Sequence, residues 1–288
     1  MRYVFAPLRV VGLLLHIIAG LAILAVAFPW LAQPKRNRII RRWSRLLLAF
    51  CGTRLRVTGV GLDPELAQGG VLLKSHGRLL LSNHVSWIDV FAIDGAIPSR
   101  FVAKSEIGRW LLLGPLVTRS GTLYIERGRR HAVAEMNRRV RDRLHAGETV
   151  AVFPEGTTTD GFSLLPFHSN LIAPALEAGC EIWPVVLRYT ERGSPSSAAG
   201  FVGEMGLVTS LWNILVARDF QIEVEFLAPI AIGADTNRHR IAHEARVAIA
   251  TALGVTIDEH PVGARSRRMP PSSDTAPEPV SDPASASR

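Results

Sequence analysis

The chain has few residues of the kinds that cross-link proteins or hold structural metals. Its 288 residues include two cysteines, Cys51 and Cys180, and these do not form a C-x-x-C pair. A disulfide framework and a zinc knuckle are therefore excluded, and we expect buried free thiols in a reducing compartment. His239 and His243 lie four apart on a predicted helix, but the H-E-x-x-H pattern is absent. We expect an exposed helix face there and no metal site.

Acidic residues are absent from positions 1–62, which carry ten basic residues. The net charge of +8 therefore comes from this segment, because the rest of the chain has nearly equal numbers of acids and bases. A basic chain can bind nucleic acid, but here the charges flank an apolar segment. This arrangement favours anionic lipid headgroups and argues against nucleic acid as the partner.

Residues 10–32 form the longest apolar run, long enough to cross a bilayer or to enter it as a hairpin. A signal peptide is the alternative, but its apolar core would be unusually long and no clear A-x-A site follows. Residues 35–50 place apolar side chains at helical spacing between arginines, which predicts an amphipathic interfacial helix. Six positive charges after the apolar run favour the cytoplasmic side. We therefore expect a membrane anchor over residues 1–50 in the inner membrane.

Strand and helix patterns alternate from residue 51 to residue 261, which predicts an α/β domain. We expect a mostly parallel mixed sheet flanked by helices. The predicted helices cover residues 130–146, 170–178 and 238–253. Residues 262–288, rich in Pro, Ser and Ala, are predicted to be a disordered tail. The predicted strands are Leu55–Val60, Val71–Leu73, Leu79–Ser82, Phe101–Ala103, Thr122–Ile125, Thr149–Phe153, Ile182–Leu187 and Gln221–Phe226.

A histidine and an aspartate, His84 and Asp89, follow the apolar run 79–81 at a spacing of five. An imidazole can take a proton from an alcohol near neutral pH, and a carboxylate can fix its tautomer. Five residues on one regular helix would separate the two side chains. The pair therefore requires His84 in a strand-to-helix turn and Asp89 in the first helical turn. No serine or cysteine nucleophile signature accompanies them, so the base is expected to activate a substrate hydroxyl.

Four segments in order resemble the motif blocks of the glycerolipid acyltransferases, the lysophosphatidic acid acyltransferase family. Asn83, His84 and Asp89 match N-H-x4-D, and residues 121–127 match G-x-x-[FY]-[IV]-x-R. Residues 153–157 read F-P-E-G-T, and an apolar-Pro-apolar block surrounds Pro184. Residues 101–106 also resemble the segment that lies between the first two motif blocks in this family. A lone H-x4-D is weak, but three ordered blocks with F-P-E-G-T are specific.

The resemblance implies an O-acyltransferase in which His84 is the general base and Asp89 orients it. Arg127 would bind an acceptor phosphate through its guanidinium, and Lys104 would lie near a substrate phosphate. The remaining residues implied to bind substrate are Asn83, Gly121, Glu155, Gly156 and Thr157. Trp87 and Tyr124 could line an acyl channel, but we expect core positions for both.

The sequence departs from the family pattern after F-P-E-G-T. The family usually continues with arginine, whereas Thr158 stands here, and a lysine-rich segment is replaced by residues 166–170, PFHSN. Fewer cations would suit a less phosphate-dependent acceptor. These stretches are similar to the branch of the family that acylates lyso-ornithine lipids.

The function implied is transfer of a fatty acyl group from acyl-CoA or acyl-carrier protein to the sn-2 hydroxyl of 1-acyl-sn-glycerol 3-phosphate. The product would be phosphatidic acid, and no cofactor besides the acyl donor is expected. A lyso-ornithine lipid acyltransferase is the alternative enzyme. A non-catalytic membrane-binding protein is the alternative of another class, against which the intact His84–Asp89 pair argues.

Overall fold

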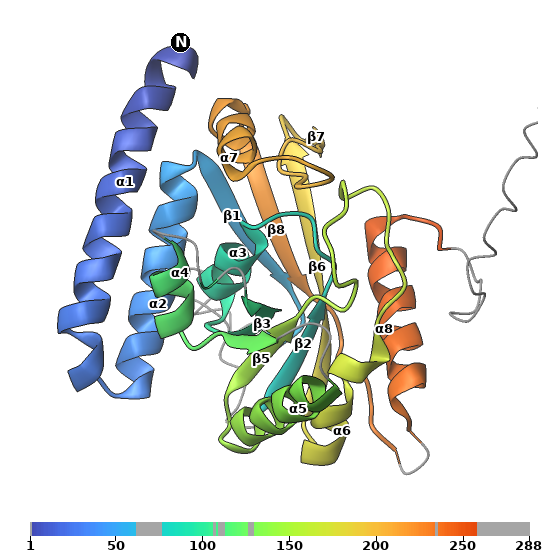
Figure 1. Ribbon diagram of the computed structural model, residues 1–288. Coiled ribbons are helices and arrows are strands. Elements are labelled where there is room, and N and C mark those ends of the chain that lie inside the picture. Colours follow the sequence, from blue (N-terminus) through green and yellow to red (C-terminus); the bar gives the residue numbers. More distant parts are fainter. Residues whose placement is uncertain are drawn as a thin grey trace, which may run out of the picture. The chain divides into compact units, whose positions relative to one another are not determined.

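The computed structural model describes residues 2–61, 77–105, 108, 113–125, 130–233 and 236–257 (Figure 1). The predicted strand Val71–Leu73 and the predicted tail lie outside these residues. The elements alternate largely as expected from the sequence.

One mixed sheet organises the described chain, with the strand order β1-β8-β6-β2-β5-β3-β4 and β7 paired with β6. All neighbours on this path are parallel except β8, which runs antiparallel to β6. The prediction of a mostly parallel mixed sheet flanked by helices is confirmed. The strands are β1 (Thr53–Gly59), β2 (Arg78–Ser82), β3 (Arg100–Lys104), β4 (Leu123–Ile125), β5 (Thr149–Val152), β6 (Glu181–Glu191), β7 (Ser194–Pro195) and β8 (Phe220–Phe226).

Helices cover both faces of the sheet, and strand side chains alternate between two apolar cores. In β2, Leu80 joins the core with α2 (Gln33–Phe50) and α3 (Asp89–Ala96). Leu79 and Leu81 join the core with α5 (Arg130–His145), α6 (Ala173–Ala178) and α8 (Arg238–Leu253). β2 is buried over its whole length, as a strand between two helical layers must be.

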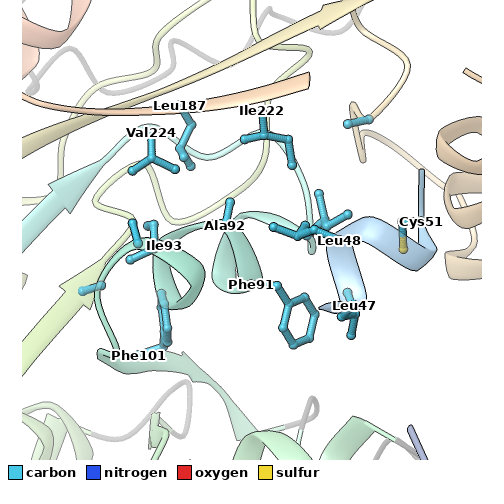
Figure 2. Packing of buried hydrophobic residues seen from close by; sticks show 14 of the residues in the cluster. Leu47, Leu48, Cys51, Phe91, Ala92, Ile93, Phe101, Leu187, Ile222 and Val224 are labelled. Carbon is cyan, nitrogen blue, oxygen red and sulfur yellow. The ribbon is translucent and has the colours of Figure 1, made fainter. Parts of the chain in front are cut away.

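Helix α3 is held between α2 and the sheet (Figure 2). Phe91, Ala92 and Ile93 of α3 are buried with Leu48 of α2 and Val224 of β8. The first turn of α3 therefore has a fixed position at the end of β2, where the candidate site begins.

The N-terminal segment is a helical hairpin of α1 (Arg2–Val26) and α2, joined through the 3-10 turn Phe28–Trp30. His16 stacks on Trp43 with ring centroids 4.8 Å apart, and its Nε2–H donates to the Trp43 carbonyl at 2.9 Å. Trp43 Nε1 donates in return to the His16 carbonyl at 3.2 Å. The polar groups of His16 thus join the two helices of the hairpin.

Among the described helices, α1 alone is long and apolar enough to cross a membrane, by length and composition. Its stretch Ala6–Val26 has a mean hydropathy of 2.3, and only 22% of it is buried within the protein. Most of the apolar surface of α1 therefore faces outward.

Two helices were not predicted, α4 (Leu113–Arg119) and α7 (Leu207–Val216). α7 reads LVTSLWNILV, a mostly apolar run of ten residues that is too short to be told from a buried strand by its pattern alone. The predicted helix 170–178 is divided into a 3-10 turn, Ser169–Leu171, and α6. β6 is longer than predicted, because its second half pairs with β8.

Candidate active site

The candidate site lies at the carboxyl ends of β2 and β5, which are parallel neighbours. His84 is in the turn between β2 and α3, and Asp89 is the first residue of α3. The predicted placement of the pair in a strand-to-helix turn and a first helical turn is therefore confirmed. Ligands in α/β sheets commonly bind at this edge.

Asp89 and His84 are in direct contact. The His84 Nδ1–H donates to Asp89 Oδ2 at 2.7 Å, and the backbone N–H groups of Val85 and Ser86 donate to the same oxygen at 2.7 and 2.9 Å. The Asp89 side chain is fully buried, whereas the His84 side chain is 20% exposed. The contact fixes the tautomer in which Nδ1 carries the proton, so Nε2 is left as the acceptor nitrogen.

Tyr189 completes the environment of Asp89, and the sequence reasoning missed it. The Tyr189 hydroxyl donates to Asp89 Oδ1 across 100 positions of sequence. Burial and the neighbouring Asp89 charge raise the pKa of Tyr189 well above its usual value, so the phenol keeps its proton. The sequence gives only a weak signal for Tyr189, which is its inward position on β6 two residues after Leu187.

The His84 ring is held by stacking on Phe153, with centroids 3.9 Å apart and planes 11° from parallel. Phe153 stacks in turn on Phe101 of β3 at 6.1 Å. Among the described residues none hydrogen-bonds to His84 Nε2. The ring is thus fixed through its face and Nδ1 while the second nitrogen stays accessible.

Asn83 and Glu155 anchor the backbone around His84. Asn83 is buried, and its carboxamide makes a reciprocal pair of bonds with the Leu187 backbone at 3.0 and 2.8 Å. Glu155 is 4% exposed, and its two oxygens accept from the N–H groups of His84 (2.7 Å) and Leu165 (2.9 Å). Burial raises the pKa of Glu155 to about 7. In this structure both side chains hold loops, and their substrate-binding roles stay predictions.

Gly156 and Thr157 are exposed beside the anchored Glu155. Gly156 has φ +72, and a Cβ on it would come within 3.2 Å of His168 Cδ2. Glycine suits this position because it tolerates positive φ and leaves room for the neighbouring ring.

Thr158, the residue that departs from the family pattern, donates through Oγ1 to the Phe201 carbonyl. The next residue, Thr159, donates its N–H to the His84 carbonyl at 2.8 Å. Thr158, at the position where the family usually has arginine, therefore joins its loop to the loop that contains Phe201.

The other predicted binding residues lie in the second motif or beside it. Gly121 has φ +96 where the chain leaves α4, and a Cβ there would overlap the Arg100 guanidinium. Lys104 ends β3, but its side chain lies outside the described residues, as does all of Arg127. Their roles stay predictions.

The two predicted core aromatics and the two helical histidines are also placed. Trp87 is half-buried, packs edge-on against Phe91 and donates to Ser210 Oγ at 3.1 Å. Tyr124 is half-buried and hydrogen-bonds to Thr118. His239 and His243 are exposed on α8. Within the described ranges, no group of three or more His, Cys, Asp or Glu residues could hold a metal ion.

A small apolar pocket of about 50 Å³ lies between α1, α2, α3 and α4. Ile23, Trp43, Phe91 and Leu116 are among its lining residues. Phe91 is two residues beyond Asp89, so the pocket adjoins the helix on which the site is built.

Comparison with known proteins identifies the family. A family model described as Acyltransferase matches residues 65–188. A lyso-ornithine lipid O-acyltransferase of Pseudomonas aeruginosa is 34% identical over 220 residues, which cover 76% of this chain and 80% of the relative. The chain belongs to the acyltransferase family. The protein is therefore an enzyme, as predicted, and the non-catalytic alternative is not supported.

Other relatives differ in their named acceptor. A 1-acyl-sn-glycerol-3-phosphate acyltransferase of Neisseria gonorrhoeae is 38% identical over 152 residues, 53% of this chain and 60% of that protein. The fold matches the crystal structure of the 1-acyl-sn-glycerophosphate acyltransferase PlsC from Thermotoga maritima, with a TM-score of 0.64 at 15% identity. That match covers 88% of this chain and 97% of PlsC, and it supports the α/β fold.

Because the pKa of Glu155 is raised, the free energy of unfolding should depend on pH. This pKa is about 7 in the folded protein against an ordinary value of 4.5. As the pH rises, Glu155 therefore loses its proton in the unfolded chain before it does so in the folded protein. The stabilising contribution of the protonated Glu155 is lost as the pH rises from about 4.5 to 7. Glu155→Gln cannot ionise, so the fall in unfolding free energy from pH 5 to pH 8 should shrink by up to about 3 kcal/mol.

Urea unfolding of detergent-solubilised protein, followed by circular dichroism, measures this difference. Glu155→Gln also loses one acceptor for a backbone N–H, so it should be less stable than the wild type at pH 5. Glu177→Gln on the exposed surface of α6 is the matched control and should keep the wild-type pH dependence. If the unfolding free energy of Glu155→Gln kept the wild-type pH dependence, Glu155 would not be the group responsible for it.

Proposed function

We propose that this acyltransferase moves a fatty acyl group from acyl-CoA or acyl-carrier protein to a free hydroxyl of a lysolipid. The observation that carries the proposal is the oriented His84–Asp89 pair, with Nδ1 bonded to the carboxylate and Nε2 accessible. The names of the relatives support a lysolipid acceptor. No enzyme nucleophile is required, because the attacking hydroxyl belongs to the acceptor.

In the proposed reaction, His84 Nε2 takes the proton from the acceptor hydroxyl as its oxygen attacks the thioester carbonyl. The imidazolium that forms is stabilised by Asp89, which stays ionised. The tetrahedral intermediate then breaks its C–S bond, the ester forms, and His84 returns the proton to the thiolate that leaves. The acyl group passes directly between the two substrates.

The acceptor headgroup is proposed to lie against Gly156 and Thr157, the exposed residues that follow Glu155. Arg127 and Lys104 are proposed to bind the phosphate of 1-acyl-sn-glycerol 3-phosphate, our first candidate acceptor, which would give phosphatidic acid.

Lyso-ornithine lipid is the second candidate acceptor, and two observations favour it. The Pseudomonas relative named for that substrate matches a larger share of this chain than the Neisseria relative does. In addition, Thr158 occupies the usual place of an arginine and is bonded to Phe201. An acceptor without phosphate would need no cation at that position.

We place the enzyme in the inner membrane, with the α/β unit on the cytoplasmic side. The apolar, mostly outward-facing α1 supports membrane insertion, and the arginines of α2 support contact with anionic lipid. The free buried thiols of Cys51 and Cys180 agree with a reducing compartment.

The function is tested by assaying the purified protein with each acceptor, lysophosphatidate and lyso-ornithine lipid, and with each donor, acyl-CoA and acyl-carrier protein. We expect ester formation with at least one pair and a clear preference for one acceptor. Phosphatidic acid would identify the first candidate. Absence of transfer to either lysolipid would refute the proposed acceptor class.

His84→Ala should lower kcat by about 10²–10⁴-fold, because the general base is lost, while membrane association is unchanged. His243→Ala, on the exposed face of α8, is the control and should retain wild-type turnover. Product formation under saturating substrate and flotation with vesicles measure the two properties. Wild-type turnover in His84→Ala, or a covalent acyl-protein trapped during turnover, would rule out the mechanism.

A further inference from the structure

Helix α7 exposes two large apolar side chains. Val208 is 81% exposed and Trp212 is 43% exposed, and their spacing of four places them on one side of the helix. On a helix surface this pair is costly in water. The opposite side of α7 is buried through Ser210 and Ile214, and Leu215 near the end of the helix is buried as well.

The buried side of α7 is attached to two other parts of the protein. Ser210 Oγ accepts from Trp87 Nε1, so α7 contacts the turn that carries His84. The Arg9 guanidinium of α1 donates to the Leu215 carbonyl at 2.9 Å, in the last turn of α7. The two helices are therefore in contact.

Helix α1 also exposes large apolar side chains, some of them near its contact with α7. Leu8, next to Arg9, is 69% exposed, and Leu15 is 62% exposed. Farther along α1, Gly20 faces Leu116 of α4. Helix α1 thus contacts α7 at Arg9 and α4 near Gly20, and the exposed Leu8 lies beside the contact with α7.

We propose that α7 is a second lipid-contacting element, and that its Val208 and Trp212 face forms one surface with the outer face of α1. The partner is the boundary between headgroups and hydrocarbon of a phospholipid bilayer, where tryptophan is favoured. The inference rests on the membrane location proposed above. It adds that the helix bonded to Trp87 is itself anchored in lipid.

Depth measurement with single cysteines tests this surface in the full-length protein. Cys51 and Cys180 are replaced by alanine, and Val208→Cys carries an environment-sensitive fluorophore. Leu15→Cys on α1 and Val247→Cys on α8, the latter 39% exposed, are the matched probes. The proteins are reconstituted in phosphatidylethanolamine–phosphatidylglycerol vesicles that contain nitroxide-labelled acyl chains.

We expect probes at 208 and 15 to be quenched several-fold more than the probe at 247. Quenching at 15 but not at 208 would overturn the role of α7 while leaving the membrane location intact. Absence of quenching at both would overturn the membrane location as well. Cross-linking between 208 positions of two copies without lipid quenching would assign the surface to self-association instead.

A second inference concerns Tyr189 and rests on independent contacts. Three donors, from His84, Val85 and Ser86, all reach Oδ2 of Asp89. Oδ1 of this fully buried carboxylate accepts from Tyr189, which is 5% exposed. A buried carboxylate oxygen without a donor is costly, so the phenol determines how firmly Asp89 stays ionised.

We infer that Tyr189 is a positioning residue that acts through Asp89 on His84. The ring of Tyr189 is held on β6 against Phe220, with centroids 5.8 Å apart. Its hydroxyl shares the negative charge of Asp89 with the imidazole. Without this donor, the His84–Asp89 pair should retain its proton to higher pH.

Tyr189→Phe removes only the hydroxyl and tests this role. We expect kcat to fall about tenfold with KM unchanged, since one buried hydrogen bond is lost. The acid limb of the pH profile of kcat/KM should move to higher pH. Phe220→Leu, which disturbs the packing of the same ring, should lower stability without moving the acid limb. An acid limb identical to the wild type in Tyr189→Phe would overturn the inference.

Discussion

The rest of the site depends on the hydrogen bonds to the buried carboxylate of Asp89. A fully buried charge is tolerated only where hydrogen bonds replace the lost water, and here the turn, the imidazole and Tyr189 supply them. Satisfying Asp89 fixes the turn between β2 and α3. It also orients the ring of His84, so the same hydrogen bonds stabilise the turn and set the geometry of the proposed proton transfer.

The surrounding structure keeps this turn in place from several directions. Asn83 binds the turn to β6 through Leu187, and Glu155 binds it to the segment that follows β5. Each of these side chains is polar, buried and bonded to backbone groups. The F-P-E-G segment therefore supports the His84 turn, in addition to its proposed place beside the acceptor, and motif matching alone does not reveal this support.

In the proposed arrangement, the N-terminal hairpin and α7 link this site to the membrane surface. α2 packs on α3, whose first residue is Asp89, and α7 reaches the same turn through Ser210 and Trp87. The helices that offer apolar surface outward are thus the ones that support the catalytic turn inward. A lysolipid acceptor that stays in the bilayer would then meet the base without leaving it.

The sequence by itself determined the α/β alternation, the apolar helix with its basic successor, and the placement of His84 and Asp89, because each is a local pattern of period, charge or spacing. Only the tertiary structure decided the antiparallel position of β8, the helix α7 and the roles of Tyr189 and Thr158. Tyr189 meets Asp89 across 100 positions of sequence, and Thr158 meets Phe201 across 43. Such contacts follow from strand order and loop packing, which no local pattern of residues encodes.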